Sequence, residues 1–332
     1  MVDIVTALMN PKSYDEPTKK IRLMQTHISW IFLTGRYAYK VKKPVNFGFC
    51  NFSTLAKRKF FCYKELKINR QFSDMYLEVV PINQFNNDIK IKGKGKTIEY
   101  AVKMRELPQE RMMCKLLEKN RVRKQTIEEI AKIVSEFHLK LKQNRRTKKY
   151  GSPRIIRYNF DENFNLVKKF IGITIDRKKF DFIKGKVYDF LEHNKKLFKE
   201  RIIDGKIKDC HGDLHSENIF LSDKIYIFDA IEFNDRLKCG DVAKDVAFFL
   251  MDLDFHKKHG LVEIFLKKYL AHTKDKEMLR LLPLYKCYYA YVRGKINSLK
   301  SADERVSVEE KQESIKLAKK YFDLAFNYAK RL

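Results

Sequence analysis

This chain of 332 residues contains little glycine, proline or tryptophan, with 12 Gly, 7 Pro and 1 Trp. The six cysteines are scattered, with no Cys-x-x-Cys pair and no His-Cys cluster at zinc spacing. This pattern argues against a disulfide framework and against a structural zinc site. We therefore expect reduced thiols in a cytoplasmic protein.

Long apolar runs are also missing. No window resembles a membrane span, and the start, MVDIVTALMNPKSYDE, lacks the basic and apolar regions of a secretory signal. There is no internal repeat and no low-complexity linker. Hydrophobic residues nevertheless make up 44% of the chain, enough to build a packed core in one large or two modest domains. We expect no membrane partner.

Acidic residues are outnumbered: 42 Asp and Glu stand against 70 Lys and Arg, a net charge of +28. Such a balance is found in nucleic-acid binders. Here the basic runs, such as 115–124 and 140–149, are spread along the chain with acidic residues between them, and no DNA- or RNA-binding motif is present. We interpret them as solvated helix faces. A polyanionic partner stays open as an alternative.

The first hundred residues are rich in strand patterns. Residues 27–34 and 36–42 form a hairpin signal around Gly35. Ser53 is expected to cap a helix that runs to about Phe72, with Leu55, Phe60, Cys62, Leu66 and Ile68 on its apolar side. Residues 77–82, 89–92 and 97–104 read as further strands, the last two joined by a glycine-containing turn. Five strands with one helix predict an antiparallel sheet rather than βαβ units.

The pattern changes after Pro108. Helical spacing dominates at 110–118, at 125–143 with a capping box of Thr126 and Glu129, and through most of 161–200. It resumes from 240 to the end, with predicted helices at about 240–256, 261–272, 276–300 and 306–331. We therefore predict an α+β protein with a β-rich domain at 1–107 and a mainly helical domain at 108–332.

The stretch between these helices carries the chemistry. It reads Asp209-Cys-His-Gly-Asp-Leu-His-Ser-Glu-Asn-Ile-Phe-Leu, followed by Lys224-Ile-Tyr-Ile-Phe-Asp. It offers one carboxylate on a tight loop (Asp213), an amide five residues later (Asn218) and a second carboxylate after a short apolar strand (Asp229). A phosphoryl transferase needs one group to accept the proton of the attacking hydroxyl and oxygen ligands for Mg²⁺. We assign Asp213 to the first task and Asn218 with Asp229 to the second.

Neighbouring residues of this stretch have weaker assignments. Glu232 could reach the same metal or a substrate group, or form a salt bridge to Arg236 or another residue of its domain. We expect His211 to hold the loop by hydrogen bonding and leave His215 unassigned. Cys210 is interpreted as a small buried residue rather than a nucleophile.

The arrangement HGDLHxxN, strand, Asp resembles the aminoglycoside phosphotransferase-like branch of the protein-kinase-like fold, which includes choline, homoserine and fructosamine kinases. In that branch HGD takes the place of the HRD of protein kinases. The likeness continues through Gly240-Asp-Val-Ala-Lys-Asp-Val-Ala, where Asp241 and Asp245 would have structural roles. It implies a two-lobe fold, with an antiparallel N-lobe that positions the nucleotide and a helical C-lobe with the catalytic loop and metal site.

The N-lobe is compatible with this resemblance. A kinase needs a strand lysine on the α/β-phosphates, paired with a helix glutamate. Lys40 and Lys42 share one face of their strand, and Glu65 lies centrally in the following helix. The family pattern favours Lys40 slightly, Lys42 stays open, and both could instead be solvated lysines. The segment Arg105, Glu106 and Leu107 resembles the one that joins the lobes, where backbone groups would meet adenine.

Two departures from protein kinases stand out. No GxGxxG lies between the first strands, only Thr34-Gly35-Arg36. Glycine-poor loops are usual in the aminoglycoside-kinase-like branch, so this absence favours that branch over protein kinases. The insert that begins at Lys43 resembles an uncharacterised bacterial group of predicted aminoglycoside phosphotransferase family enzymes, as do the segments His27-Ile-Ser-Trp and Tyr291-Val-Arg-Gly-Lys. Arg293 and Lys295, beside several tyrosines, would either line an acceptor pocket or rim a tyrosine core.

The sequence thus predicts an ATP- and Mg²⁺-dependent phosphotransferase that moves the γ-phosphate to a hydroxyl of a small molecule. One alternative keeps the fold and makes the protein a protein kinase or nucleotidyl transferase. The other is a non-catalytic binder of RNA or another polyanion, which would have no use for Asp213, Asn218 and Asp229 together. Neither the acceptor nor the oligomeric state follows from the sequence.

Overall fold

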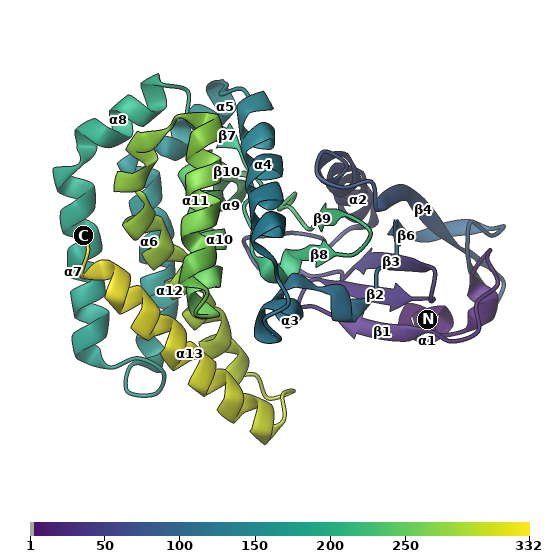
Figure 1. The fold of residues 1–332 in the computed structure, drawn as a ribbon. Helices are drawn as coiled ribbons and strands as arrows, with labels where there is room; N and C mark the ends of the chain where they lie inside the picture. The colour runs from purple at the N-terminus through teal and green to yellow at the C-terminus, as the bar shows by residue number, and fades with distance from the viewer. Residues whose placement is uncertain (1–2) are drawn as a thin grey trace. The chain divides into compact units, whose positions relative to one another are not determined.

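The computed structural model describes residues 3–332, which form two compact units (Figure 1). Unit 1 comprises residues 3–115 together with Glu217–Asp235, and unit 2 comprises Leu116–Ser216 together with Arg236–Leu332. The hairpin that follows the Asp213 motif therefore groups with the N-terminal residues. The compact units differ in this from the predicted lobes, 1–107 and 108–332, whose separate functions stay a prediction.

Unit 1 is built on a six-stranded antiparallel sheet of order β1-β2-β3-β6-β4-β5, with β8 and β9 as a separate hairpin. Its elements are α1 (Ile4–Leu8), η1 (Pro11–Ser13), β1 (Arg22–Gln25), β2 (Ser29–Leu33), β3 (Tyr37–Lys42), α2 (Leu55–Asn69), β4 (Tyr76–Phe85), β5 (Asp88–Ile91), β6 (Lys96–Arg105), η2 (Gln109–Arg111), β8 (Ile219–Leu221) and β9 (Ile225–Ile227). Three short elements span the borders between the units: α3 (Met113–Glu118), η5 (Ser216–Asn218) and α9 (Asp235–Lys238).

The two faces of this sheet bury different side chains, because successive residues of a strand point to opposite faces. On one face, Tyr39 and Val41 of β3 join a cluster that includes Leu8 of α1. The opposite face carries Lys40 and Lys42 and is covered by α2, which packs against β6 and β4. The alternation of β3 therefore places both lysines beneath the helix that contains Glu65.

Unit 2 is mainly helical, and its two short strands, β7 and β10, pair antiparallel. Its elements are α4 (Lys124–Lys140), α5 (Arg145–Lys148), η3 (Lys149–Gly151), α6 (Pro153–Val167), η4 (Lys168–Phe170), α7 (Arg177–His193), α8 (Lys195–Ile203), β7 (Ile207–Asp209), β10 (Cys239–Asp241), α10 (Ala243–Phe255), α11 (His259–Thr273), η6 (Lys276–Arg280), α12 (Leu282–Ser301) and α13 (Val308–Ala329). Helix α12 packs against α10 and α13, and α11 packs against α4 (Figure 1). Helix α10 is buried almost throughout, and its N-terminal turn carries Asp245.

The sequence missed one strand of the sheet. Strand β1 is largely exposed, so it lacks the alternation of buried and exposed residues that identifies a strand. It pairs with β2 through the turn Thr26–Ile28, so the first hairpin of the chain precedes the one at Gly35. Within the first hundred residues the sheet therefore has six strands rather than five, while the antiparallel prediction is confirmed.

Three local predictions were wrong. Helix α2 is capped by Thr54, whose hydroxyl accepts from the N–H of Lys57, because Ser53 instead hydrogen-bonds Asn51. Phe60 is 60% exposed and lies outside the buried side of α2, which carries polar groups such as Glu65. Helix α4 begins after Arg123 without a side-chain cap, so the capping box is not formed there.

All six cysteines are free thiols, five of them buried. Among the helices of residues 3–332, none combines the length and the apolar character that crossing a membrane requires.

Candidate active site

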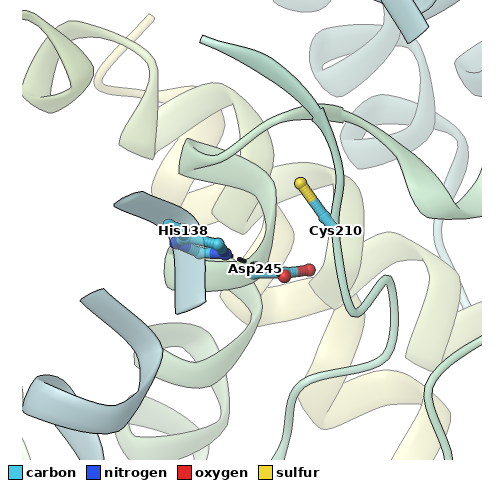
Figure 2. Close-up of side chains that lie close together, drawn as sticks. All are labelled: His138, Cys210 and Asp245. Carbon is cyan, nitrogen blue, oxygen red and sulfur yellow. Dashed lines mark hydrogen bonds and ion pairs between the residues drawn. The ribbon is translucent and has the colours of Figure 1, made fainter. Parts of the chain in front are cut away.

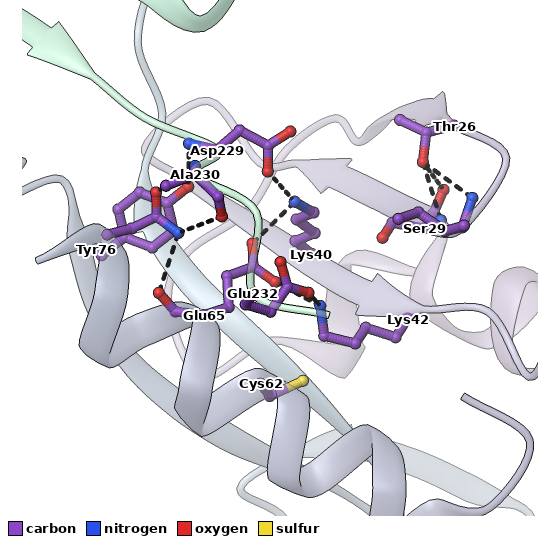
Figure 3. A network of polar contacts seen from close by, with 12 residues as sticks. Thr26, Ser29, Lys40, Lys42, Cys62, Glu65, Tyr76, Asp229, Ala230 and Glu232 are labelled. Atoms are coloured by element: carbon purple, nitrogen blue, oxygen red, sulfur yellow. Dashed lines mark hydrogen bonds and ion pairs between the residues drawn. The ribbon is translucent and has the colours of Figure 1, made fainter. Parts of the chain in front are cut away.

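Two buried lysines of β3 share one glutamate of α2 (Figure 3). Lys40 Nζ lies 2.8 Å from Glu65 Oε1, and Lys42 Nζ lies 2.6 Å from Glu65 Oε2. Lys40 is 8% exposed, Lys42 is 1% exposed and Glu65 is fully buried. Both lysines are therefore buried rather than solvated. A buried ammonium group requires a charged or polar partner. Both lysines meet the helix glutamate.

Each lysine also binds a second carboxylate from the segment after β9. Lys40 Nζ lies 2.5 Å from Asp229 Oδ1, and Lys42 Nζ lies 2.5 Å from Glu232 Oε1. Of the alternatives for Glu232, the salt bridge within its own unit is therefore observed, with Lys42 as the partner. Arg236 pairs instead with Glu162 in unit 2.

Electrostatics favour the charged forms of Glu65, Lys40 and Lys42, because each pKa is shifted in that direction. Burial alone would raise the pKa of Glu65, but the two lysines outweigh it and lower that pKa to about 2. Burial likewise opposes the charge of Lys40, yet Asp229 and Glu65 raise its pKa well above the usual value. Burial raises the pKa of Glu232, against the pull of Lys42. Two ammonium groups and three carboxylates leave one net negative charge when all are ionised.

The β8–β9 hairpin brings the two predicted metal ligands to the same end of a ladder. Ile219 pairs with Ile227, and the N–H of Phe228 donates to the C=O of Asn218 at 3.1 Å. Asn218 and Asp229 therefore flank the open end of the hairpin. Asp229 has a φ of 61°, a left-handed conformation that costs energy for a residue other than glycine and often marks a functional site. Its carboxylate is 41% exposed.

The backbone at and after Asp229 is held by hydrogen bonds from its N–H groups to side chains. The N–H of Asp229 donates to the Tyr76 hydroxyl at 3.1 Å, and the N–H of Ala230 donates to Asn69 Oδ1 at 2.8 Å. Tyr76 begins β4 and Asn69 ends α2. These bonds stabilise the strained backbone of Asp229 from two elements of the same unit.

The predicted adenine-binding segment ends β6 and continues beyond it. Glu106 accepts hydrogen bonds from the N–H of Gly35 at 2.7 Å and from Arg22 Nη2 at 2.9 Å, so its side chain holds the turn between β2 and β3. Arg105 donates to the Tyr226 hydroxyl at 3.1 Å, and Leu107 is buried. Contact of this segment with a nucleotide stays a prediction.

In unit 2, Asp245 of α10 braces the loop that carries Asp213. Its two oxygens accept from the N–H of His211 at 2.7 Å and of Gly212 at 2.8 Å. Gly212 has a φ of 85°, which glycine adopts without strain. The N–H of Asp213 then meets His211 Nδ1 at 3.2 Å. The expected roles of His211 in holding the loop and of Asp245 in bracing it match these contacts.

Asp241 has a comparable structural role. Its carboxylate forms two hydrogen bonds of 2.7 Å with Arg201 and accepts from the N–H of Ala243 at the start of α10. Arg201 is 1% exposed and also pairs with Asp275. Asp241 therefore fixes the start of the helix that bears Asp245.

His138, Cys210 and Asp245 gather in one buried cluster beneath the loop (Figure 2). Their ligand-type atoms lie within 4.8 Å of one another. His138 Nε2 lies 3.1 Å from Asp245 and Nδ1 lies 2.7 Å from the Tyr269 hydroxyl, while Cys210 donates to Gly240. Burial raises the pKa of the Cys210 thiol well above its usual value, whereas metal binding requires the thiolate. We interpret the cluster as a brace, and Cys210 as the small buried residue that the sequence predicts.

Asp213 itself is paired with His215. Its carboxylate is 38% exposed and lies 3.5 Å from His215 Nε2. Burial raises the pKa of Asp213, but His215, together with His211 and Arg293, brings it below the usual value. Burial lowers the pKa of His215, and Asp213 more than compensates, so that pKa is raised. Asp213 is therefore held as an anion.

The imidazole of His215 is fixed by aromatic stacking. It stacks on Phe248 of α10 at 4.9 Å between centroids, and Phe248 stacks on Tyr289 of α12 at 4.1 Å. Tyr289 and its neighbours Tyr288 and Tyr291 are buried, as the core interpretation of α12 predicts. Lys295 donates to Asn163 at 2.7 Å within the same unit.

Several of these contacts were missed by sequence reasoning. Glu232 was left open because its partner, Lys42, is 190 residues away. His138 and Asn69 lie in ordinary helical patterns, with nothing nearby that indicates a functional motif. The only available signal was indirect: His138 is a polar residue on the apolar stripe of α4, where a buried partner is required.

Comparisons with known sequences identify relatives without a described function. No protein-family model matches the chain. Uncharacterized proteins from Mycobacterium bovis and Mycobacterium tuberculosis are each 28% identical over 288 residues, which is 86% of this chain and 56% of theirs. The chain thus spans about half the length of the curated relatives it matches.

Comparison with solved structures identifies the fold. A choline/ethanolamine kinase family protein from Mesorhizobium loti is similar over 95% of this chain and 94% of its own, with a TM-score of 0.54 and 12% identity. Spectinomycin phosphotransferase, solved with ADP and spectinomycin, is similar over 96% and 95%, with a TM-score of 0.48 and 13% identity. The first similarity confirms the predicted α+β, protein-kinase-like fold.

Proposed function

We propose that the protein is an ATP- and Mg²⁺-dependent phosphotransferase that moves the γ-phosphate of ATP to a hydroxyl of a small molecule. The observation that carries this proposal is the position of Lys40, buried between Glu65 at 2.8 Å and Asp229 at 2.5 Å. A strand lysine paired with a helix glutamate is the phosphate-positioning device of kinases. The kinase-like fold supports the same conclusion.

Asn218 and Asp229 would hold the metal. Their amide and carboxylate oxygens are the hard donors that Mg²⁺ prefers. A metal held by these residues would supply positive charge that offsets the negative charge developing on the phosphates during transfer. Lys40 would then exchange Asp229 for a phosphate while it keeps its contact with Glu65.

Asp213 would accept the proton of the attacking hydroxyl. Its lowered pKa keeps the carboxylate ionised at neutral pH, and its partial exposure leaves it accessible to a substrate. The brace from Asp245 fixes the backbone of the loop, which limits the motion of the base. Precise placement of such a group is a large part of its catalytic value.

The remaining partners follow from the same proposal. Backbone groups of Arg105, Glu106 and Leu107 would meet the adenine ring. Six free thiols and the proposed use of ATP support a cytoplasmic location.

The test uses the purified protein with ATP labelled at either the α- or the γ-phosphate, together with a library of hydroxyl-bearing metabolites. We expect label from γ-ATP, and none from α-ATP, in a small-molecule product whose formation requires Mg²⁺. Transfer of the α label would indicate a nucleotidyl transferase instead. Absence of any Mg²⁺-dependent nucleotide binding in the same preparation would contradict the proposal.

A further inference from the structure

Lys42 differs from Lys40 in being sealed from solvent. Its side chain is 1% exposed, and its Nζ lies 4.9 Å from the ring centre of Phe52, which is itself fully buried. Phe52 belongs to the insert between β3 and α2. The side chain of Lys40 is 10% exposed, and its partner Asp229 is 41% exposed. A phosphate can therefore approach the Lys40 pair, whereas Phe52 and two carboxylates already surround Lys42.

Lys42 also keeps two buried carboxylates in place. It lies 2.6 Å from Glu65 Oε2 and 2.5 Å from Glu232 Oε1, and both glutamates are less than 5% exposed. Without the lysine, two like charges would remain buried near one another, which is strongly unfavourable. One ammonium group thus fixes both the orientation of the glutamate that Lys40 needs and the segment that begins at Asp229.

The position of Glu232 explains why this matters. It lies three residues after Asp229, within the segment that Asn69 anchors at Ala230. The segment is held at two residues that follow Asp229. Ala230 forms a hydrogen bond, and Glu232 forms an ion pair. The left-handed turn at Asp229 is then maintained by contacts that do not involve a nucleotide.

We propose that Lys42 and Glu232 are a pair of positioning residues that orient Glu65 and the Asp229 segment, and that Lys40 alone of the two lysines meets the phosphates. This inference rests on the proposed phosphotransferase function and assigns separate tasks to neighbouring lysines of one strand. Nucleotide binding would then replace the Lys40–Asp229 contact and leave the Lys42–Glu232 contact unchanged.

The experiment compares Lys42→Met, Glu232→Gln and the double variant. Lys40→Met, alone and combined with Glu232→Gln, provides the matched lysine control. The exposed pair Lys92 and Glu78, 2.7 Å apart on the surface of the same unit, supplies a control double variant. Each protein is assayed for kcat, for KM of ATP, for ADP binding without added metal by calorimetry, and for its urea unfolding midpoint without nucleotide.

We expect Lys42→Met to lower kcat by roughly 100-fold, as small misplacements of catalytic groups do. Adding Glu232→Gln should restore most of this loss, because the unpaired buried charge is removed. ADP affinity of that double variant should stay within about threefold of wild type, the scatter of uncoupled substitutions. Lys40→Met should weaken ADP binding and gain nothing from Glu232→Gln.

The inference is overturned if the double variant is as slow as Lys42→Met, or if both lysine variants lose ADP affinity equally. Unfolding provides a readout that does not depend on activity. The decreases in unfolding midpoint of Lys42→Met and Glu232→Gln, added together, should exceed the decrease of the double variant. A double variant whose decrease equals that sum would contradict the pairing. A wild-type protein that binds no nucleotide would refute the proposed function, while this unfolding comparison would still decide whether the pair exists.

Discussion

Lys40 and Asp229, 189 residues apart in the chain, form an ion pair with 2.5 Å between Nζ and Oδ1. The contact joins the predicted phosphate lysine to a predicted metal ligand within unit 1. Asp229 also raises the pKa of Lys40, against the burial that would lower it. A nucleotide with its metal would supply each residue with a new partner of opposite charge.

Lys40→Met is expected to lower kcat/KM for ATP by about 100-fold or more, since a buried charge-assisted contact to a phosphate contributes several kcal/mol. The substitution also leaves Asp229 without its cation. Steady-state kinetics with varied ATP measures the effect. Lys92→Met, on the exposed surface of unit 1, is the control and should stay near wild type. Equal kinetics for both variants would disprove the assignment of Lys40.

Asp229→Ala should abolish the Mg²⁺-dependent part of nucleotide binding, because a carboxylate oxygen ligand is removed. Calorimetric titration with ADP, with and without Mg²⁺, measures this part directly. The wild-type protein should bind ADP more tightly with the metal than without it. The variant should bind with the same affinity in both conditions. A metal-dependent gain that survives in Asp229→Ala would exclude this residue as a ligand.

His215 should give the protein a pH-dependent stability. Its pKa is raised above 6.5 by Asp213, against burial and Arg293, with Asp252 as a further acidic neighbour. The raised pKa means that the contribution is full below about pH 6.5 and is lost as pH rises through the folded-state pKa. The free energy of unfolding should therefore differ more between wild type and His215→Gln at acidic than at alkaline pH. A pH-independent difference would contradict this pairing.

Asp245→Asn should destabilise unit 2 by about 1–3 kcal/mol, the cost of a buried donor left without an acceptor. The amide has one acceptor oxygen, while the N–H groups of His211 and Gly212 need two. Urea unfolding measures the loss. Asp323→Asn removes an exposed partner of Lys179 and should cost less than about 1 kcal/mol. Similar losses for both variants would indicate that the brace contributes little.

The sequence identifies the candidate site residues more readily than the ion pairs that they form. The Asp213 loop, Asn218 and Asp229 are adjacent in sequence, so spacing alone identifies them as a set. The strand lysines and Glu65 were found because alternation along β3 and the central place of Glu65 in α2 are local patterns. Such patterns do not decide between Lys40 and Lys42, since both lie on the same face.

Contacts between distant segments lay beyond sequence reasoning. Nothing near Glu232 indicates a lysine 190 residues away, and nothing near Asn69 indicates that it binds the backbone of Ala230. Strand β1 was missed for a related reason: as an exposed edge strand it has no buried face to produce alternation. Local propensity and periodicity indicate which residues are buried. They do not indicate which distant residues these contact.

The rate of γ-phosphate transfer by Asp213→Asn, measured beside its affinity for ADP, tests the central claim most directly. The substitution keeps the shape of the side chain and removes its ability to accept a proton. We predict that transfer falls by at least about 100-fold, the range of general-base catalysis, while ADP affinity is largely retained. A variant that transfers phosphate at the wild-type rate would contradict the account.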